Sequence, residues 1–145
     1  MFIKIKKLND SAQMPFRATS GSAGADLFSC LEADVILKPA ERKLIPTGLI
    51  IEIPEGYGGF VFPRSSLASK HGISLSNCVG VIDSDYRGEL KIAVINHSDE
   101  SFVIKNGDRI AQLVIIPVCS AEFIEDDSLS ETERGEGGFG STGKI

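Results

Sequence analysis

Apolar residues come in short runs along most of the chain, and turn residues separate one run from the next. At residues 3–6, Ile-Lys-Ile-Lys, apolar and charged positions alternate, which is the pattern of a half-exposed β-strand. Isoleucine and valine together number 25 against 11 leucines, and β-branched residues favour strands. The pattern predicts strands at residues 3–6, 34–37, 42–45, 49–53, 59–62, 72–75, 79–82, 89–96, 102–105 and 112–118.

One segment differs from these runs and predicts a short helix at residues 65–72. Ser65 and Ser66 open it with hydroxyl groups that suit a helix cap, and Gly72 closes it about two turns later. Many short strands with a single helix indicate an all-β fold, which is a sandwich, a jelly roll or a barrel. With 145 residues, the chain is long enough for one domain with a sizeable core.

The composition changes after Ile124. Residues 125–134 are acidic and polar, and five of the nine residues 135–143 are glycine. We therefore expect a β domain over residues 1–124 and a flexible, glycine-rich arm over residues 125–145. Composition alone is typical of a frayed tail, but a lone Phe139 among glycines is unusual in a linker. Glycines that bare backbone N–H groups suit the alternative role of a lid over a polyphosphate.

Charge and cysteine content narrow the classes of partner. The formal net charge of −5 disfavours a nucleic acid or an anionic membrane, but an anionic small molecule needs only local positive charge. The three cysteines are far apart without CxxC spacing, which indicates free thiols. No apolar run approaches the roughly 18 residues that span a bilayer, and the first residues lack the apolar core of a signal peptide. We expect a cytoplasmic protein.

The densest group of functional side chains lies at residues 83–87, Asp-Ser-Asp-Tyr-Arg, between two apolar runs. Its Asp-x-Asp spacing mimics a calcium-binding loop, but Arg87 and Val94 stand where later ligands belong. A tight turn between two strands accounts for the acids but leaves Tyr86 unexplained. Arg64 is a second candidate, because it brings a guanidinium group to the free N–H groups at the start of the predicted helix.

Five segments, taken together and in order, resemble the signature motifs of the trimeric dUTP pyrophosphatases, or dUTPases. They are residues 23–27 (Ala-Gly-Ala-Asp-Leu), 63–68 (Pro-Arg-Ser-Ser-Leu-Ala), 77–88, 107–112 (Gly-Asp-Arg-Ile-Ala-Gln) and 134–143. Each segment alone is a weak signal, and their order and spacing make the resemblance specific. This chain departs from the family pattern at Ala25, where an aromatic residue is usual, and at Ser66, where glycine is common.

The resemblance implies a jelly-roll-like distorted barrel that forms a homotrimer, with each active site built from three chains. It implies Mg²⁺-dependent hydrolysis of dUTP to dUMP and pyrophosphate, which keeps uracil out of DNA and supplies dUMP for dTTP synthesis. By the same resemblance, Asp83 orients the water that attacks the α-phosphorus, and Tyr86 packs against the deoxyribose and excludes a 2′-hydroxyl. The residues expected to read the uracil edge are Asn77, Val81, Ile82 and Lys91.

The resemblance implies a second group of residues around the triphosphate. The phosphates are expected to contact Arg64, Ser65, Ser66 and Gln112, and the arm is expected to contribute Arg134, Gly140, Ser141 and Thr142. Phe139 of the arm is expected to stack over the uracil. Mg²⁺ is expected to be held mainly by the phosphates, with Asp26 bound to its water shell. Asp85 and Arg87 are expected to form a buried or interfacial pair that fixes the turn, without a chemical role.

The residues leave three other functions open. A dCTP deaminase shares the implied fold and an Arg-Ser-Ser segment, although its chemistry requires a glutamate that activates water at the pyrimidine ring. A catalytically silent, dUTP-binding regulator would keep the site without releasing pyrophosphate. A purely structural β-sandwich would leave the glycine-rich tail with Phe139 unexplained.

Overall fold

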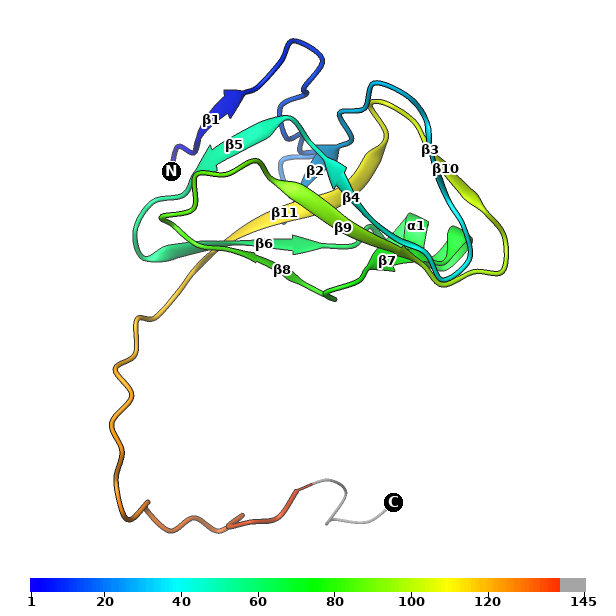
Figure 1. Ribbon diagram of the computed structural model, residues 1–145. Helices are drawn as coiled ribbons and strands as arrows, with labels where there is room; N and C mark the ends of the chain where they lie inside the picture. Colours follow the sequence, from blue (N-terminus) through cyan, green and yellow to red (C-terminus); the bar gives the residue numbers. More distant parts are fainter. Residues whose placement is uncertain (139–145) are drawn as a thin grey trace.

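The computed structural model describes residues 1–138, which form eleven strands and one short helix (Figure 1). In chain order they are β1 (Lys4–Lys7), β2 (Ala25–Phe28), β3 (Val35–Leu37), β4 (Arg42–Pro46), β5 (Leu49–Glu52), β6 (Tyr57–Phe62), α1 (Ser65–His71), β7 (Ile73–Leu75), β8 (Gly80–Ile82), β9 (Lys91–Asn96), β10 (Phe102–Ile104) and β11 (Arg109–Pro117). The short strands follow from the frequent turn residues, which end each run after a few positions.

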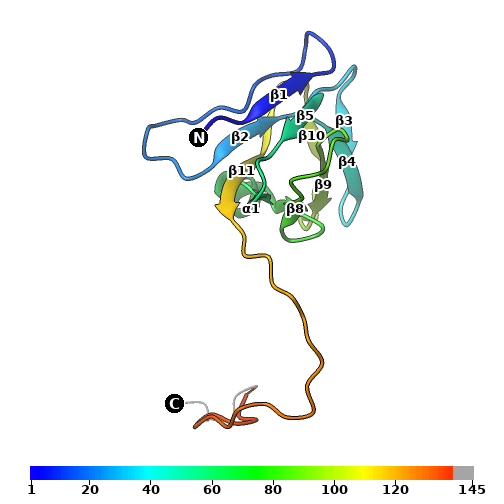
Figure 2. The same ribbon diagram turned by 90° about the vertical axis from the view of Figure 1, so that its left-hand side faces the viewer.

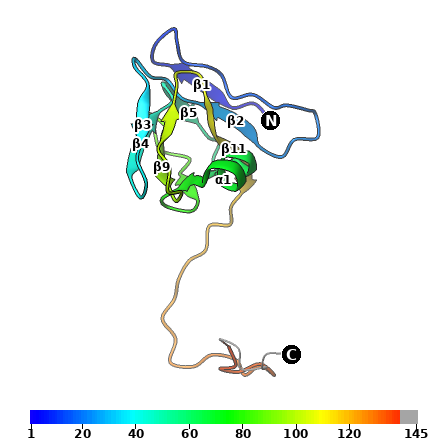
Figure 3. The ribbon, with the colours of Figure 1, turned by 90° about the vertical axis from the view of Figure 1, so that its right-hand side faces the viewer.

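The strands form four small antiparallel sheets. One has the order β2-β11-β6-β8, a second has the order β4-β9-β7, and two are the pairs β1-β5 and β10-β3. Figure 2 shows the strands arranged around a common interior, and Figure 3 shows α1 at one end of this barrel, next to β11. The barrel therefore brings β8 and β9, which belong to different sheets, to the two sides of one opening.

Buried apolar side chains alternate with more exposed ones along the strands, and the buried ones fill the interior of the barrel. In β9, Ile92 and Val94 are buried, whereas Lys91 is exposed. Each fully buried aliphatic side chain stabilises the fold by roughly 1.5–3 kcal/mol relative to an exposed one. The core consists of Ala12, Leu27, Leu37, Ile45, Leu49, Ile51, Ile53, Val61, Ile73, Leu75, Ile82, Leu90, Ile92, Val94, Ile104, Ile110, Ala111 and Leu113.

The buried polar side chains are hydrogen-bonded, as burial requires. The Asn96 amide, fully buried at the end of β9, donates to the carbonyls of Leu37 (3.0 Å) and Glu100 (2.7 Å). Its Oδ1 accepts hydrogen bonds from the backbone N–H and the hydroxyl of Ser98. Asn96 therefore ties β9 to β3 and to the loop that leads into β10.

The prediction of an all-β fold with one short helix is confirmed. Each predicted strand has a counterpart, although β11 begins at Arg109, before the predicted start at residue 112. The predicted hydroxyl cap of α1 is wrong, because extended Arg64 occupies the cap position and its side chain makes no capping bond. At the other end Gly72 adopts φ 65°, as a glycine cap requires.

After Pro117 the described chain leaves the barrel (Figure 1). Residues 118–138 contain no helix or strand, and nearly all are exposed. The division between a domain and an arm at residue 125 stays a prediction. Within residues 1–138, the structure contains no helix with the length and apolar character of a membrane span.

Candidate active site

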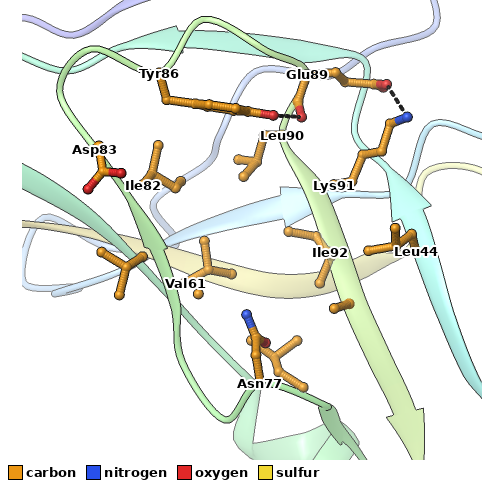
Figure 4. Close-up of a pocket in the computed structure, with 14 residues that line it drawn as sticks. Leu44, Val61, Asn77, Ile82, Asp83, Tyr86, Glu89, Leu90, Lys91 and Ile92 are labelled. Atoms are coloured by element: carbon orange, nitrogen blue, oxygen red, sulfur yellow. Dashed lines mark hydrogen bonds and ion pairs between the residues drawn. The ribbon is translucent and has the colours of Figure 1, made fainter.

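A cavity of about 440 Å³ opens between β8 and β9, in the size range of small-molecule sites (Figure 4). Its floor is apolar and includes Val61, Leu75, Ile82, Leu90 and Ile92. Its polar lining residues are Asn77, Asp83, Tyr86, Glu89 and Lys91. Six of the residues predicted to contact the nucleoside or the attacking water line this cavity: Asn77, Val81, Ile82, Asp83, Tyr86 and Lys91.

A tight turn between β7 and β8 places Asn77 at the cavity. The backbone N–H of Cys78 donates to the Leu75 carbonyl (3.1 Å), and that of Val79 donates to the Asn77 carbonyl (2.6 Å). Cys78 has a φ of 61°, which is uncommon for a residue other than glycine. Such strained backbone clusters at ligand sites, where it re-aims neighbouring groups. Here it turns the chain so that Asn77 and β8 line the same cavity.

The ring of Tyr86 lies across one side of the cavity (Figure 4). Its hydroxyl donates to the backbone carbonyl of Glu89 (3.1 Å). A Cβ at Gly88 would lie 2.6 Å from the Tyr86 ring carbon Cζ, so only glycine leaves room for the ring in this position. The tyrosine, the glycine and the glutamate backbone therefore form one packed unit at the cavity.

Asp83 follows β8 directly and is exposed at the cavity edge. None of the ion pairs within residues 1–138 involves it, so its carboxylate faces solvent. Asp85 and Arg87 do not form a buried pair within residues 1–138, and an interfacial pair stays a prediction. Both side chains are exposed, and the Arg87 guanidinium donates instead to the carbonyls of Ser84 (2.6 Å) and Tyr86 (2.9 Å). Arg87 still fixes the turn, but through backbone oxygens.

A second group of charges forms where β2, β6 and β11 meet. Asp26 accepts hydrogen bonds from Arg64 Nε at Oδ1 (2.9 Å) and from an Arg109 terminal nitrogen at Oδ2 (3.2 Å). Arg64 also donates to the Arg109 carbonyl (3.2 Å). Asp26 is largely buried, with one guanidinium group beside each of its carboxylate oxygens. Two guanidinium groups around one carboxylate leave net positive charge beside the start of α1.

The sequence reasoning missed Arg109. Strict alternation would place it and Gln112 on opposite faces of the strand. The structure has a register irregularity between Arg109 and Ala111, where Ile110 and Ala111 are both buried. This bulge lets Arg109 reach Asp26, which pairs with Gln112 in the ladder. The sequence did contain one indication that Arg109 belongs to the site, because Arg109 lies within the motif at residues 107–112.

The residues predicted for the phosphates lie apart from the cavity. Ser65 and Ser66 are exposed in the first turn of α1, and the Gln112 amide donates to the Pro63 carbonyl (3.0 Å). None of these residues, nor Arg64, lines the cavity between β8 and β9. Arg134 is exposed in the arm. The predicted residues Phe139, Gly140, Ser141 and Thr142 lie outside the described residues.

The described residues do not form a protein cage for a metal ion. Among residues 1–138, no cluster of three or more His, Cys, Asp or Glu side chains has a geometry that could hold one. Asp26 already pairs both oxygens with arginine, which disfavours direct ligation, although a carboxylate oxygen can accept a further hydrogen bond from water. The residues around Asp26 therefore fit a metal ion that is held chiefly by phosphates and whose bound water lies near Asp26.

Comparison with known proteins places this chain in a family. The dUTPase family model matches residues 10–143. The deoxyuridine 5'-triphosphate nucleotidohydrolase of Nautilia profundicola is 60% identical over 144 residues, which cover 99% of this chain and 100% of that protein.

Solved structures agree with this match. A mutant Staphylococcus bacteriophage 80alpha dUTPase with dUpNHpp gives a TM-score of 0.90 at 33% identity, covering 99% of both chains. A mutant dUTPase from phage phi11 of S. aureus, described with a structural Mg(II) ion, gives 0.82 at 28% identity, covering 90% of this chain and 100% of that chain. The fold, the cavity between β8 and β9, and the sequence match over nearly the whole length agree, and the chain belongs to the dUTPase family.

Proposed function

We propose that the protein hydrolyses dUTP to dUMP and pyrophosphate in the presence of Mg²⁺. The observation that carries the proposal is the convergence of Asn77, Asp83, Tyr86 and Lys91 on one cavity of nucleoside size. The name of the Nautilia profundicola relative and the dUpNHpp complex of the bacteriophage 80alpha enzyme support the choice of dUTP, because dUpNHpp is a dUTP analogue. Hydrolysis at the α-phosphorus keeps uracil out of DNA and provides dUMP for dTTP synthesis.

Uracil enters the cavity between β8 and β9 in this proposal. The Asn77 amide and the backbone of Val81 and Ile82 offer donors and acceptors to the edge of the base, near Lys91. The apolar floor below them excludes water, which strengthens each of these hydrogen bonds. A methyl group at C5 of the base would have to displace backbone in close contact, so thymine is rejected.

Tyr86 selects deoxyribose in this proposal. Its ring lines the cavity, packs on Gly88 and donates to the Glu89 carbonyl, so it has little freedom to retreat. A ribose 2′-hydroxyl would meet the ring, and its own hydrogen-bonding group would stay unpaired. Both effects raise the free energy of bound UTP relative to dUTP.

Asp83 acts as the general base on the attacking water. A carboxylate can orient a water molecule and accept a proton from it. The water oxygen forms a bond to the α-phosphorus, the bond from that phosphorus to the bridging oxygen of the β-phosphate breaks, and pyrophosphate leaves. The proton of the water goes to Asp83. Exposure of Asp83 at the cavity edge supports this role.

The triphosphate binds at the group around Arg64, with Ser65, Ser66 and the second N–H of Gln112 as further donors. Mg²⁺, when bound, would neutralise charge on the phosphates, and Asp26 would accept a hydrogen bond from a water molecule of the ion. The arm closes the site: Arg134 contacts the γ-phosphate, Phe139 stacks on uracil, and Gly140, Ser141 and Thr142 cover the phosphates. Such positioning supplies most of the rate gain in phosphoryl transfer.

The proposed assembly is a homotrimer in which the two groups meet across subunits. Its support is that Arg64 and Gln112 lie away from the cavity within one chain. Exposed apolar side chains are available for subunit contacts: Ile36 and Val103 face each other across β3 and β10 and are 53% and 41% exposed.

A pyrophosphate-release assay with dUTP, UTP, dCTP and dTTP, with and without Mg²⁺, tests the proposal. We expect release from dUTP alone, and only with Mg²⁺. Chromatography of the products that showed deamination of dCTP would indicate the deaminase, and dUTP binding in calorimetry without pyrophosphate release would indicate a silent regulator. The deaminase is disfavoured because the glutamate at the cavity, Glu89, already binds the Gly48 N–H (3.0 Å) and Lys91 (3.5 Å).

A further inference from the structure

Glu89 is a charged residue at the cavity that the proposed reaction does not use. Its side chain is only 21% exposed, and Oε1 accepts a hydrogen bond from the Gly48 backbone N–H (3.0 Å). Its Oε2 lies 3.5 Å from Lys91 Nζ. Its backbone carbonyl accepts the hydroxyl hydrogen bond of Tyr86 (3.1 Å). Figure 4 shows Tyr86 and Lys91 reaching Glu89 from opposite sides.

The turn between β4 and β5 holds the chain at residues 89–90. The buried Thr47 donates to the Leu90 carbonyl with both its backbone N–H (3.2 Å) and its hydroxyl (2.7 Å). The Leu90 N–H donates to the Leu49 carbonyl (2.8 Å). Together with the bond from Gly48 to Glu89, four hydrogen bonds join this turn to residues 89–90.

Gly48 makes this turn possible. Its φ is 67°, and a Cβ there would lie 2.7 Å from Ala12 Cβ and 3.0 Å from Cys30 Sγ. The tight, fixed turn points its N–H at the Glu89 carboxylate, and a hydrogen bond to an ionised acceptor is stronger than a neutral one. The β4–β5 turn therefore sets the position of Glu89, although the turn and Glu89 are far apart in the sequence.

We propose that Glu89 is a positioning residue for sugar discrimination: by anchoring on Gly48, it fixes the carbonyl that holds the Tyr86 hydroxyl against the deoxyribose site. This inference rests on the proposed dUTP hydrolysis. Tyr86 projects from an exposed loop, and without a fixed acceptor its ring would swing about the side-chain torsions. The ring could then move aside and leave room for a 2′-hydroxyl. Glu89 acts through Tyr86 and touches neither the phosphates nor the attacking water.

The test is the ratio of kcat/KM for dUTP to that for UTP in wild type, Glu89→Ala and Glu89→Gln. Alanine removes the acceptor for Gly48, and we expect the ratio to fall about tenfold, as loss of one charge-assisted hydrogen bond allows. Glutamine keeps a carbonyl oxygen for Gly48 and loses only the charge opposite Lys91. We expect Glu89→Gln to keep the ratio within about threefold of the wild-type value.

Glu41 offers a matched control. Its carboxylate also accepts from a backbone N–H, that of Lys38 (2.7 Å), and pairs with a lysine, Lys43 (3.3 Å), but it lies outside the cavity. We expect Glu41→Ala to leave the ratio at the wild-type value. Equal effects of Glu41→Ala and Glu89→Ala would show a general loss of stability and overturn the proposal.

A double-mutant cycle with Tyr86→Phe tests the link directly. This variant keeps the ring and removes only the bond to the Glu89 carbonyl, so it reports even if Glu89→Ala fails to fold. We expect Tyr86→Phe to lower the ratio about tenfold, and Glu89→Ala to add little in that background. Additive effects, or an unchanged ratio in Tyr86→Phe, would overturn the inference. Failure of wild type to hydrolyse dUTP would instead overturn the proposed function.

Discussion

At the scale of single residues, chemistry and positioning are carried by different side chains. Asp83 is exposed, and no ion pair within residues 1–138 involves it, as suits a group that must meet water. Asp26 has the same side chain but is largely buried between Arg64 and Arg109. In the proposed function, these environments suit Asp83 to proton transfer and Asp26 to fixing guanidinium groups.

Asp83→Asn tests the assignment of the base. The amide keeps the size of the side chain but cannot accept the proton, so we expect kcat for dUTP to fall by about two to four orders of magnitude. Binding of dUpNHpp, measured by calorimetry, should stay within about threefold of wild type, because no substrate contact is removed. An unchanged kcat would remove Asp83 from this role.

At the scale of the elements, short connections decide where the functional groups lie. The β7–β8 turn orients Asn77, the β4–β5 turn anchors Glu89, and the bulge in β11 brings Arg109 to Asp26. Each of these is an irregularity that a regular strand pattern does not contain. The barrel strands supply a rigid frame, and the irregular positions place the chemistry.

The connection between β3 and β4 provides a test of pH dependence. A hydrogen bond from the Lys38 backbone N–H lowers the pKa of Glu41 below its ordinary value of 4.5. A lowered folded-state pKa stabilises the fold above the unfolded-state value, and this stability is lost as the pH falls through the folded-state pKa. Wild type should therefore lose its advantage in melting temperature over Glu41→Gln as the pH falls below about 4.5.

The melting temperatures of wild type and Glu41→Gln, followed from about pH 7 to pH 3, check this expectation. Glu122→Gln, an exposed change after the last strand, serves as the control. A difference between wild type and Glu41→Gln that stays constant across this range would contradict the assignment.

Removal of residues 134–145 tests the arm. The described part of the arm makes no strand or helix, so we expect the barrel to fold with a melting temperature within about 2 °C of wild type. Turnover of dUTP should fall by about two orders of magnitude, because the lid no longer excludes water and orders the phosphates. Removal of residues 144 and 145 alone, beyond the motif, is the control. Near-normal turnover of the longer truncation would refute the lid.

At the scale of the whole molecule, the two groups of residues that make up the proposed site lie at different places in a single chain. The cavity lies between β8 and β9, whereas the arginines around Asp26 lie where β2, β6 and β11 meet. A triphosphate bound at both places requires another copy of the chain to bring its arginines to the cavity. The separation of the groups supports a shared site of the kind that the family resemblance implies.

Mixed oligomers of Asp83→Asn and Arg64→Ala chains test the shared site. Random mixing in equal amounts should place both wild-type residues in about a quarter of the sites if they come from different subunits. We expect each pure variant to be nearly inactive and the co-expressed mixture to recover about a quarter of wild-type activity. Asp83→Asn mixed with Asn77→Ala is the control, because both residues line the same cavity and no site regains both. No recovery in the first mixture would place Arg64 and Asp83 in one chain.

Much of the fold could be predicted, and the departures have physical reasons. Alternation at residues 3–6 and in β9 predicted strands, because burial on one face requires that pattern. The prediction of a hydroxyl cap for α1 was wrong because Arg64 takes the cap position in an extended conformation. A buried Asp85–Arg87 pair does not form within residues 1–138, because the Arg87 guanidinium instead donates to backbone carbonyls of the same turn.

The sequence by itself determined the kind of chain and the set of reactive groups. Periodicity gave an all-β fold, and the five ordered segments indicated the family, because both depend on residue type and spacing along the chain. Only the tertiary structure decided which groups meet. The cavity at β8 and β9, the arginine pair on Asp26 and the anchoring of Glu89 on Gly48 join residues distant in sequence, and their geometry depends on strand register, a bulge and tight turns. Such contacts arise from packing of the whole barrel, which no local pattern encodes.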